Sequence, residues 1–435
     1  MSSFMQQPLA DASRRAPHWM QSLQARGLSL WEHVQLPTTR NENWKYTNLR
    51  ALREDYAAAN PDLVRLDSLP EGIRAELGGA LLVFVDGIYQ EALSKAPTAP
   101  GCQLVRFSDA DDVQSAKIAG QLNSTLDAEE HVFAALNTAA LQDGVYIDVA
   151  ANSCVAEPIH ILWVVQANSA PTAINQRLLV SLGESAQAAV IEQFVSLDGA
   201  EASFCNGLSE LLLGPNSQLS YTRLHEEQGS AVHVGGVHAR LRRDARLSSF
   251  HLALGSELKR LDIVVQYDEP GAHADLNGVY LPRGKEHIDY HTTIEHAVPN
   301  CTTDEVFRGI VADQATAVFN GRIHIHPQAQ KTRAELSNRN LLTSKEATIN
   351  TKPELEIYAD DVQCAHGATV AQLDELALHY LRTRGVSRAE AEVMLSFGFI
   401  NELIDALELR GLRDYLRPLL ATRFARESSL ARHLL

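Results

Sequence analysis

Short runs rich in β-branched and aromatic residues dominate the middle of the chain, from about residue 145 to residue 365. Such runs are typical of β-strands, and too few helical segments lie between them for a doubly wound fold. The pattern predicts a mainly β region built as a sandwich, a barrel or a β-solenoid, and its irregular spacing leaves these three alternatives open. The clearest runs are Val145–Val149, Ile159–Val165, Arg177–Leu182, Leu219–Leu224, Leu261–Tyr267, Gly278–Leu281 and Thr316–Ile325.

The segment before this β region has a mixed character. Near the N-terminus the spacing of apolar residues predicts a helix that breaks at Gly27 and stops at Pro37. Further along, Leu81–Val85 is typical of a strand, and the following Asp86 and Gly87 predict a turn. We therefore expect residues 1–145 to form an N-terminal helical and mixed domain. The apolar residues of the predicted helix are Leu23, Leu28, Leu30, Trp31 and Val34.

The segment after the β region, residues 369–435, has a helical pattern. Asp374 can cap a first helix, and Gly385 supplies the left-handed residue that ends it. Ser387 and Glu390 form a capping box that opens a second helix. Apolar residues recur in that helix at spacings of three and four, and they form one stripe: Val393, Phe397, Ile400, Ile404 and Leu407. The stripe must cover either the end of the strand region or a partner protein.

The overall charge limits the classes of partner. The 435 residues carry 54 acidic and 38 basic side chains, a formal net charge of −16. An acidic chain repels a phosphate backbone and an anionic lipid surface, so we expect neither nucleic acid nor a membrane as a partner. The five cysteines are widely spread without a CxxC pair, and the N-terminus carries no apolar signal segment. These features predict a reducing compartment, the cytoplasm.

The signatures of common enzymes are missing from the sequence. It contains no GxxxxGK[ST] phosphate-binding loop, and it contains no GxGxxG, HExxH or GxSxG motif. This argues against the common hydrolases and nucleotide-dependent enzymes, and we expect that the chain does not hydrolyse ATP through a phosphate-binding loop.

Cys364 and His366 are the first candidate metal ligands. In an extended strand both side chains lie on the same face, about 7 Å apart along the strand. A thiolate and an imidazole together suit iron and zinc. Two ligands are too few for a closed site, so a partner chain would have to complete it. The alternative is a buried cysteine and a hydrogen-bonded histidine at a domain junction.

Two further histidine groups are candidates. His287, Asp289 and His291 align on one face of a strand, where they form a metal site, an acid–base pair or an exposed polar row. His324 and His326 share one side of a second strand and resemble the paired histidines of small β-barrel metal sites. The spacing does not locate their remaining ligands.

Longer stretches of sequence carry a family resemblance. They are Arg40–Thr47, His287–His296, Phe319–Ile323, Gln328–Thr332, Glu354–Thr369 and Tyr380–Gly385. The fifth is the most specific and reads ELEIYADDVQCAHGAT. On these stretches, which span nearly the whole chain, the sequence resembles the SufB/SufD family of iron–sulfur cluster assembly proteins.

The resemblance implies a fold and a set of partners. It implies a right-handed parallel β-helix over residues 146–368, between the N-terminal domain at residues 1–145 and the C-terminal helical domain at residues 369–435. It implies a scaffold subunit of the SUF system that pairs with SufB through the β-helix. It also implies that the SufC ATPase binds the C-terminal helices, which places nucleotide chemistry on another chain.

The resemblance also implies a role for individual residues. SufB-type chains carry a ligand cysteine in the segment that matches Leu336–Asn340, where this sequence has none, and this favours the SufD branch of the family. His366 corresponds to the family histidine that faces the SufB cysteine across the interface. It is therefore the candidate ligand of a nascent iron–sulfur cluster, transient and shared with SufB, with Cys364 as a weaker candidate.

Two other interpretations remain open at this point. A β-helix carbohydrate enzyme would use acidic or histidine residues in a surface groove, and it would act on polysaccharide without affinity for an ATPase. A homodimer of this chain, paired through the same solenoid surface, would serve as a storage or structural form.

Overall fold

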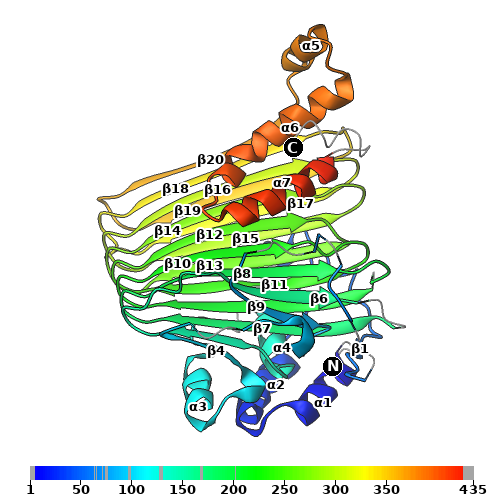
Figure 1. Cartoon of the computed structure of the whole chain (residues 1–435). Coiled ribbons are helices and arrows are strands. Elements are labelled where there is room, and N and C mark those ends of the chain that lie inside the picture. Colours follow the sequence, from blue (N-terminus) through cyan, green and yellow to red (C-terminus); the bar gives the residue numbers. More distant parts are fainter. Residues whose placement is uncertain are drawn as a thin grey trace.

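Parallel pairing between alternate strands organises the middle of the chain. The computed structural model describes residues 5–62, 64, 66–70, 72–73, 77–96, 99–126, 131–166, 170–200 and 202–424. Strands β5 to β20 alternate between two sheets, and within each sheet every strand from β5 or β6 onward pairs in parallel with the strand two positions later in the chain, up to β19 and β20. The result is a β-solenoid of about 7 turns, with 42% strand and 23% helix. This confirms the mainly β solenoid flanked by helices (Figure 1).

The odd-numbered sheet has the order β19-β17-β15-β13-β11-β9-β7-β5-β4, and β1 pairs with β7. The bounds are β1 (Ala57–Ala58), β4 (Cys102–Arg106), β5 (Val145–Val149), β7 (Thr172–Leu182), β9 (Ser203–Leu213), β11 (Val232–Leu241), β13 (Leu258–Tyr267), β15 (His287–His296), β17 (Thr316–Ile325) and β19 (Thr348–Ile357).

The even-numbered sheet has the order β20-β18-β16-β14-β12-β10-β8-β6-β2-β3. The bounds are β2 (Ala80–Val85), β3 (Ile88–Tyr89), β6 (Ile159–Val165), β8 (Gln187–Ser196), β10 (Gln218–His225), β12 (Arg246–Leu254), β14 (His273–Leu281), β16 (Thr302–Val311), β18 (Arg333–Leu342) and β20 (Gln363–Gln372).

The core lies between the two sheets. In the odd sheet, Leu261 pairs with Tyr290 and Tyr290 pairs with Phe319, so side chains at the same position of successive coils stack. All three are buried in the largest apolar cluster of the molecule. Each coil therefore buries its apolar face against the coils before and after it, which is the source of stability in a solenoid.

One corner of the solenoid repeats the same backbone conformation. Seven residues between odd and even strands have positive φ: Asn152, Ser185, Asn216, Asp244, Gly271, Asn300 and Lys331. Asn, Asp and Gly reach this left-handed conformation at the lowest cost. The N–H of Ser185 donates to the carbonyl of Pro215, and the N–H of Asn216 donates to that of Arg243, so the ladder continues around the corner.

The N-terminal helices lie at the start of the solenoid (Figure 1), whereas the described chain ends beside β14, where the Arg423 side chain donates to the Leu281 carbonyl. The helical elements are α1 (Gln6–Arg15), η1 (His18–Met20), α2 (Gln21–His33), η2 (Glu42–Trp44), η3 (Glu91–Leu93), η4 (Phe107–Asp109), α3 (Asp112–Gln121) and α4 (Val132–Ala139). The predicted break at Gly27 is wrong, because α2 runs through it. A Cβ there would lie 2.5 Å from the Ala139 nitrogen, so glycine permits close packing of α2 on α4.

The strand and turn predicted before the β region are confirmed. β2 is followed by Asp86 and Gly87, both with positive φ, and by the antiparallel strand β3. β2 pairs with β6 and β4 pairs with β5, so segments before residue 145 contribute strands to both solenoid sheets. The division into domains at residues 145 and 368 stays a prediction.

Three helices follow the solenoid: α5 (Glu375–Thr383), α6 (Arg388–Asp405) and α7 (Arg410–Phe424). Asp374 caps α5, Gly385 has a φ of 87°, and Ser387 and Glu390 form the predicted capping box. The apolar stripe of α6 packs with α7 on residues of the even sheet. Of the two alternatives for the stripe, the structure therefore shows the intramolecular one, while α5 projects beyond the last coil (Figure 1).

Candidate functional site

Cys364 and His366 lie on β20, the outermost strand of the even sheet. Cys364 pairs with Ala334 and His366 pairs with Leu336, and both partners belong to the core. Partners in parallel strands face the same side of a sheet, so Cys364 and His366 share the core-facing side, as the extended spacing predicts. Cys364 packs against the core, whereas His366 is exposed.

The exposure of His366 follows from its place at the end of the stack. β19 and β20 are the last strands of their sheets, and each has a paired strand on one side only within the described part of the chain. Side chains that a further coil would cover are therefore open to solvent. Among the large apolar residues of this end, Ile357 is 40% exposed, Val370 48% and Tyr358 61%.

Cys364 and His366 do not complete a metal site within this chain. Among the described residues, no third histidine, cysteine or carboxylate joins them in a cluster with metal-ligand spacing. Burial raises the pKa of the Cys364 thiol, which disfavours the thiolate that binds metals. His366 is therefore the better placed of the two candidates, and a metal site built on it would need ligands from outside the described chain.

The row of His287, Asp289 and His291 on β15 faces the N-terminal segment. The Thr47 hydroxyl donates to Asp289 Oδ2 at 2.5 Å and lies 2.9 Å from His287 Nε2. His291 Nε2 lies 3.1 Å from Asp289 Oδ1. The predicted alignment is confirmed, and the row holds the segment that contains the Arg40–Thr47 motif.

Arg260 completes this contact from β13. Its guanidinium donates to Asp289 Oδ2 at 2.8 Å and to the Asn43 carbonyl at 2.7 Å, and it lies 4.6 Å from the centre of the Trp44 ring. Burial alone would raise the pKa of Asp289, but Arg260, His291 and Thr47 together hold it well below its usual range. Asp289 is therefore an ionised anchor with a structural role.

His324 in β17 and His326 directly after it lie on the same side of the extended chain, as alternation predicts, while Ile323 and Ile325 are buried in the core. Their third partner is Glu295 of β15, whose Oε2 lies 2.7 Å from His324 Nδ1 and 3.0 Å from His326 Nε2. The sequence contained Glu295 beside the other histidines, but the strand pairing that brings it to β17 was not visible in the spacing.

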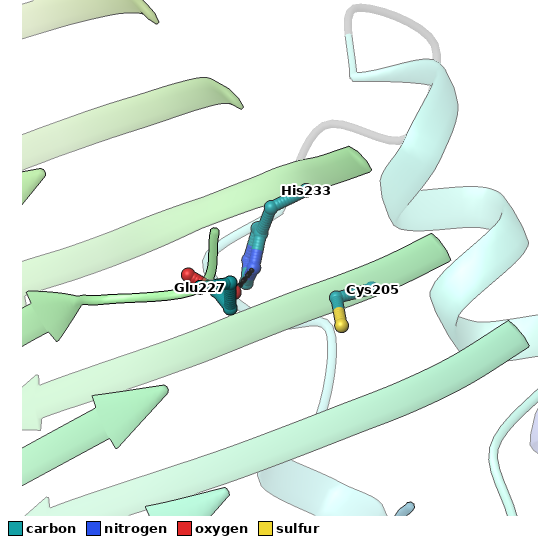
Figure 2. Close-up of side chains that lie close together, drawn as sticks. All are labelled: Cys205, Glu227 and His233. Carbon is teal, nitrogen blue, oxygen red and sulfur yellow. Dashed lines mark hydrogen bonds and ion pairs between the residues drawn. The ribbon is translucent and has the colours of Figure 1, made fainter. Parts of the chain in front are cut away.

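A second cluster lies inside the solenoid and was missed in the sequence. Figure 2 shows Cys205 of β9 and His233 of β11, which are register partners on neighbouring strands, beside Glu227 from the preceding loop. His233 Nδ1 lies 2.5 Å from Glu227 Oε1, and all three side chains are buried. No motif marks the cluster, because its members meet only once the coils are in register.

The electrostatics of this buried cluster indicate an internal ion pair. The Lys259 ammonium lies 3.4 Å from Glu227 Oε2. Burial would raise the pKa of Glu227, but Lys259 and His233 hold it well below the usual range. Burial raises the pKa of the Cys205 thiol well above its ordinary value. The negative charge is already balanced and the thiol is protonated, so the cluster offers little attraction to a further cation.

The remaining cysteines have simple environments. All five cysteines are free, which agrees with the absence of a disulfide pattern. Cys301 follows the left-handed corner residue Asn300, in a buried stack of small side chains with Ala186, Ser217, Ala245 and Ala272. No helix among the described residues has both the length and the apolar character needed to cross a bilayer.

Comparison with known proteins agrees with this architecture. Residues 164–399 match the SufBD core domain of SUF system FeS cluster assembly, and residues 3–161 match the SufBD protein N-terminal region. The iron–sulfur cluster assembly protein SufD of Escherichia coli is 32% identical over 93% of this chain and 92% of its own length. An iron–sulfur cluster assembly SufBD family protein of Synechocystis is 30% identical over 90% of this chain and 88% of its own length.

A third relative is more distant but covers as much of the chain. The iron–sulfur cluster assembly protein SufD of Bacillus subtilis is 24% identical over 92% of this chain and 93% of its own length. The two matched domains cover the solenoid, the N-terminal segment and most of α6. The chain therefore belongs to the SufB/SufD family of the SUF iron–sulfur cluster assembly system.

Proposed function

We propose that this chain is the SufD-type scaffold subunit of a cytoplasmic SUF assembly complex, with no catalytic activity of its own. It pairs with SufB through the β-helix and with the SufC ATPase through its C-terminal helices. SufD relatives from two organisms match over nine-tenths of the chain. The sequence lacks a phosphate-binding loop, so ATP hydrolysis belongs to SufC.

The observation that carries the proposal is the uncovered last coil of the solenoid. β19 and β20 are ten-residue strands at the ends of their sheets. Long open edges pair readily with another chain unless they are covered. A second β-helix placed against this end would cover Tyr358 and Val370, which are now exposed. SufB is the partner with that fold, and a homodimer of this chain is the competing occupant of the same surface.

His366 is the proposed metal ligand that this chain contributes at the interface. A nascent iron–sulfur cluster is the cargo, and it is shared with SufB for a short time. An imidazole from this chain and a thiolate from SufB would supply ligands from both sides of the interface, which suits iron. Cys364 could assist, but its partly buried thiol has a raised pKa.

The C-terminal helices provide a surface for SufC. Leu376 and Tyr380 of α5 are 79% and 57% exposed, and exposed apolar side chains on one helix favour protein binding. Because the stripe of α6 is anchored on the even sheet, a movement of SufC on these helices would pass to the solenoid. ATP-driven dimerisation of SufC would thereby bias an interface with closed and open states and expose His366 to iron and sulfide.

Co-expression tests the proposal. This chain alone would carry an affinity tag, and it would be purified anaerobically after expression with a matching SufB and SufC. The proposal predicts recovery of both partners, with one SufB per tagged chain. Recovery of the tagged chain as a homodimer, with neither SufB nor SufC, would overturn it.

A further inference from the structure

Two imidazole rings, that of His324 in β17 and that of His326 directly after this strand, converge on one carboxylate oxygen of Glu295 in β15. Glu295 Oε2 lies 2.7 Å from His324 Nδ1 and 3.0 Å from His326 Nε2, and the two rings are 4.2 Å apart. Both rings direct a nitrogen at this oxygen. If each contact is a hydrogen bond, each ring carries its proton on the nitrogen that faces Glu295. A divalent cation that replaced these protons would be held by the same three atoms.

Arg322 fixes the orientation of the carboxylate. Its guanidinium donates to Glu295 Oε1 at 2.9 Å and to the two oxygens of Glu356 at 2.8 and 3.1 Å. The hydrogen bond to Oε1 leaves Oε2 directed at the histidines. Partners of this kind orient the ligands of metal sites. Glu356 balances the charge of Arg322, so the negative charge of Glu295 remains available to a cation.

The cluster is also accessible. The side chains of Glu295, His324 and His326 are 24%, 18% and 35% exposed, so an ion from solvent can reach them. The buried Cys205 cluster differs from this site in exposure and in charge. It is closed to solvent, and the Lys259 ammonium already balances the charge of the Glu227 carboxylate.

We propose that Glu295, His324 and His326 form a binding site for a divalent transition-metal ion. Two imidazoles and one carboxylate form the donor set that binds non-haem iron(II), zinc and cobalt(II), and they leave coordination positions open. Magnesium prefers oxygen ligands and is excluded as the cognate ion. The site belongs to the odd sheet and shares no ligand with His366 of the even sheet.

Cobalt(II) is the probe for the test. The full chain, purified without a histidine tag and stripped with a chelator, would be titrated with Co²⁺ while visible absorption and bound metal are measured. We expect one Co²⁺ per chain with ligand-field bands, displaced by Zn²⁺ and unaffected by Mg²⁺. Protons compete with the metal ion for imidazole nitrogen, so binding should be weaker in acid than at neutral pH.

Matched variants assign the ligands. His324→Ala and His326→Ala remove one ligand each, and Glu295→Gln removes the charge while keeping the size of the side chain. We expect each to weaken Co²⁺ binding at least tenfold. His33→Ala changes an exposed histidine of α2 and should leave binding unchanged. Circular dichroism shows whether each variant is folded. If an alanine variant does not fold, Glu295→Gln, which keeps the size of the side chain, still tests the site.

Two results would overturn the assignment. One is the absence of stoichiometric Co²⁺ binding to the unmodified chain at pH 7.5. The other is binding that folded Glu295→Gln and His326→Ala proteins retain at the original affinity, because the ion would then be held elsewhere.

Discussion

The Thr47 hydroxyl donates a hydrogen bond of 2.5 Å to Asp289, a residue 242 positions later in the chain. This contact joins the N-terminal segment to the outer face of the odd sheet. Glu42 extends the attachment through an ion pair of 2.8 Å with Lys352 of β19. The segment that carries the Arg40–Thr47 motif is therefore attached to the odd sheet from β15 to β19, its last strand.

Asp289→Asn tests the strength of this attachment. The substitution removes the charge that faces Arg260 inside the structure, and we expect the free energy of unfolding to fall by about 3 kcal/mol. Urea unfolding at pH 7 measures it. The folded pKa of Asp289 lies below the unfolded value of about 3.9, so the loss should be constant above about pH 4. Asp55→Asn removes the charge from an exposed pair with Arg53, and solvent screening should make its effect much smaller than that of Asp289→Asn. Equal effects of the two substitutions would contradict the anchoring role.

Gly27→Ala tests the packing of α2 on α4. The added Cβ would lie 2.5 Å from the Ala139 nitrogen and 2.8 Å from the Thr138 carbonyl carbon, and backbone atoms cannot move aside as a flexible side chain can. We expect the free energy of unfolding, measured by thermal unfolding, to fall by about 1–3 kcal/mol. The clash should outweigh the greater helix-forming tendency of alanine. Gly120→Ala on α3 meets no atom within 4 Å and should be neutral or stabilising by up to about 1 kcal/mol. An unchanged free energy of unfolding in the Gly27→Ala protein would contradict the prediction, because α2 and α4 would then move apart at no cost.

Glu305→Gln tests the cost of an acid inside the solenoid. Burial raises the pKa of Glu305 to about 7, whereas the unfolded value is about 4.3. Between these values the folded state holds a proton that the unfolded state has lost, so stability falls as the pH rises through this window, by about 3 kcal/mol. Glutamine stays neutral. Urea unfolding at pH 5 and pH 8 should therefore show a smaller decrease for the variant than for the unmodified chain.

The control for this prediction is Glu335→Gln, at a side chain that is 63% exposed. It should keep the full pH dependence. Glu226, whose pKa burial also raises to about 7, should leave a residual slope in the Glu305→Gln protein. Identical slopes in that protein and in the unmodified chain would mean that Glu305 is ionised in the folded state.

Leu376→Asp tests the proposed SufC surface. Leu376 of α5 and Val113 of α3 are both 79% exposed, so aspartate at either position should leave the fold intact. We expect the Leu376→Asp chain to lose SufC in an affinity capture while it retains SufB, because a charge enters an apolar contact. Val113→Asp should capture both partners. Equal SufC capture by the two variants would place the SufC surface elsewhere.

Much of the fold could be predicted from local patterns, because strand alternation and helix capping depend on neighbouring residues. Ser387 and Glu390 illustrate this, as do Ile323 and Ile325. The solenoid itself was ambiguous from spacing. Its left-handed corner residues recur at intervals of roughly 30 residues, within the range of solenoid repeats, but Ser185 and Lys331 take the place of Asn, Asp or Gly and obscure the repeat.

The candidate sites could also be predicted only in part, where their residues are neighbours in the sequence. Alternation predicted that His324 and His326 share a face, but Glu295 joins them only through the pairing of β15 with β17. Gly27 led to the wrong prediction of a broken helix, because the close packing on Ala139 that glycine permits is a tertiary contact. Local sequence does not show such a contact. The spacing of Cys364 and His366 made both candidates and family resemblance favoured His366, but its exposure could not be predicted without knowing that β20 ends the sheet. Contacts between coils are long-range, so local spacing does not encode them.

The most direct test of the account uses the complex of this chain with SufB and SufC, purified anaerobically with the His366→Ala substitution in this chain. The iron and acid-labile sulfide contents of that complex would be measured. His18→Ala, at another exposed histidine, is the matched control. The account predicts unchanged protein stoichiometry in both variants and a roughly tenfold loss of iron and sulfide in His366→Ala alone, because removal of a ligand weakens metal binding at least that much. Full cluster content in the His366→Ala complex would contradict the assignment of His366 as a ligand of the nascent cluster.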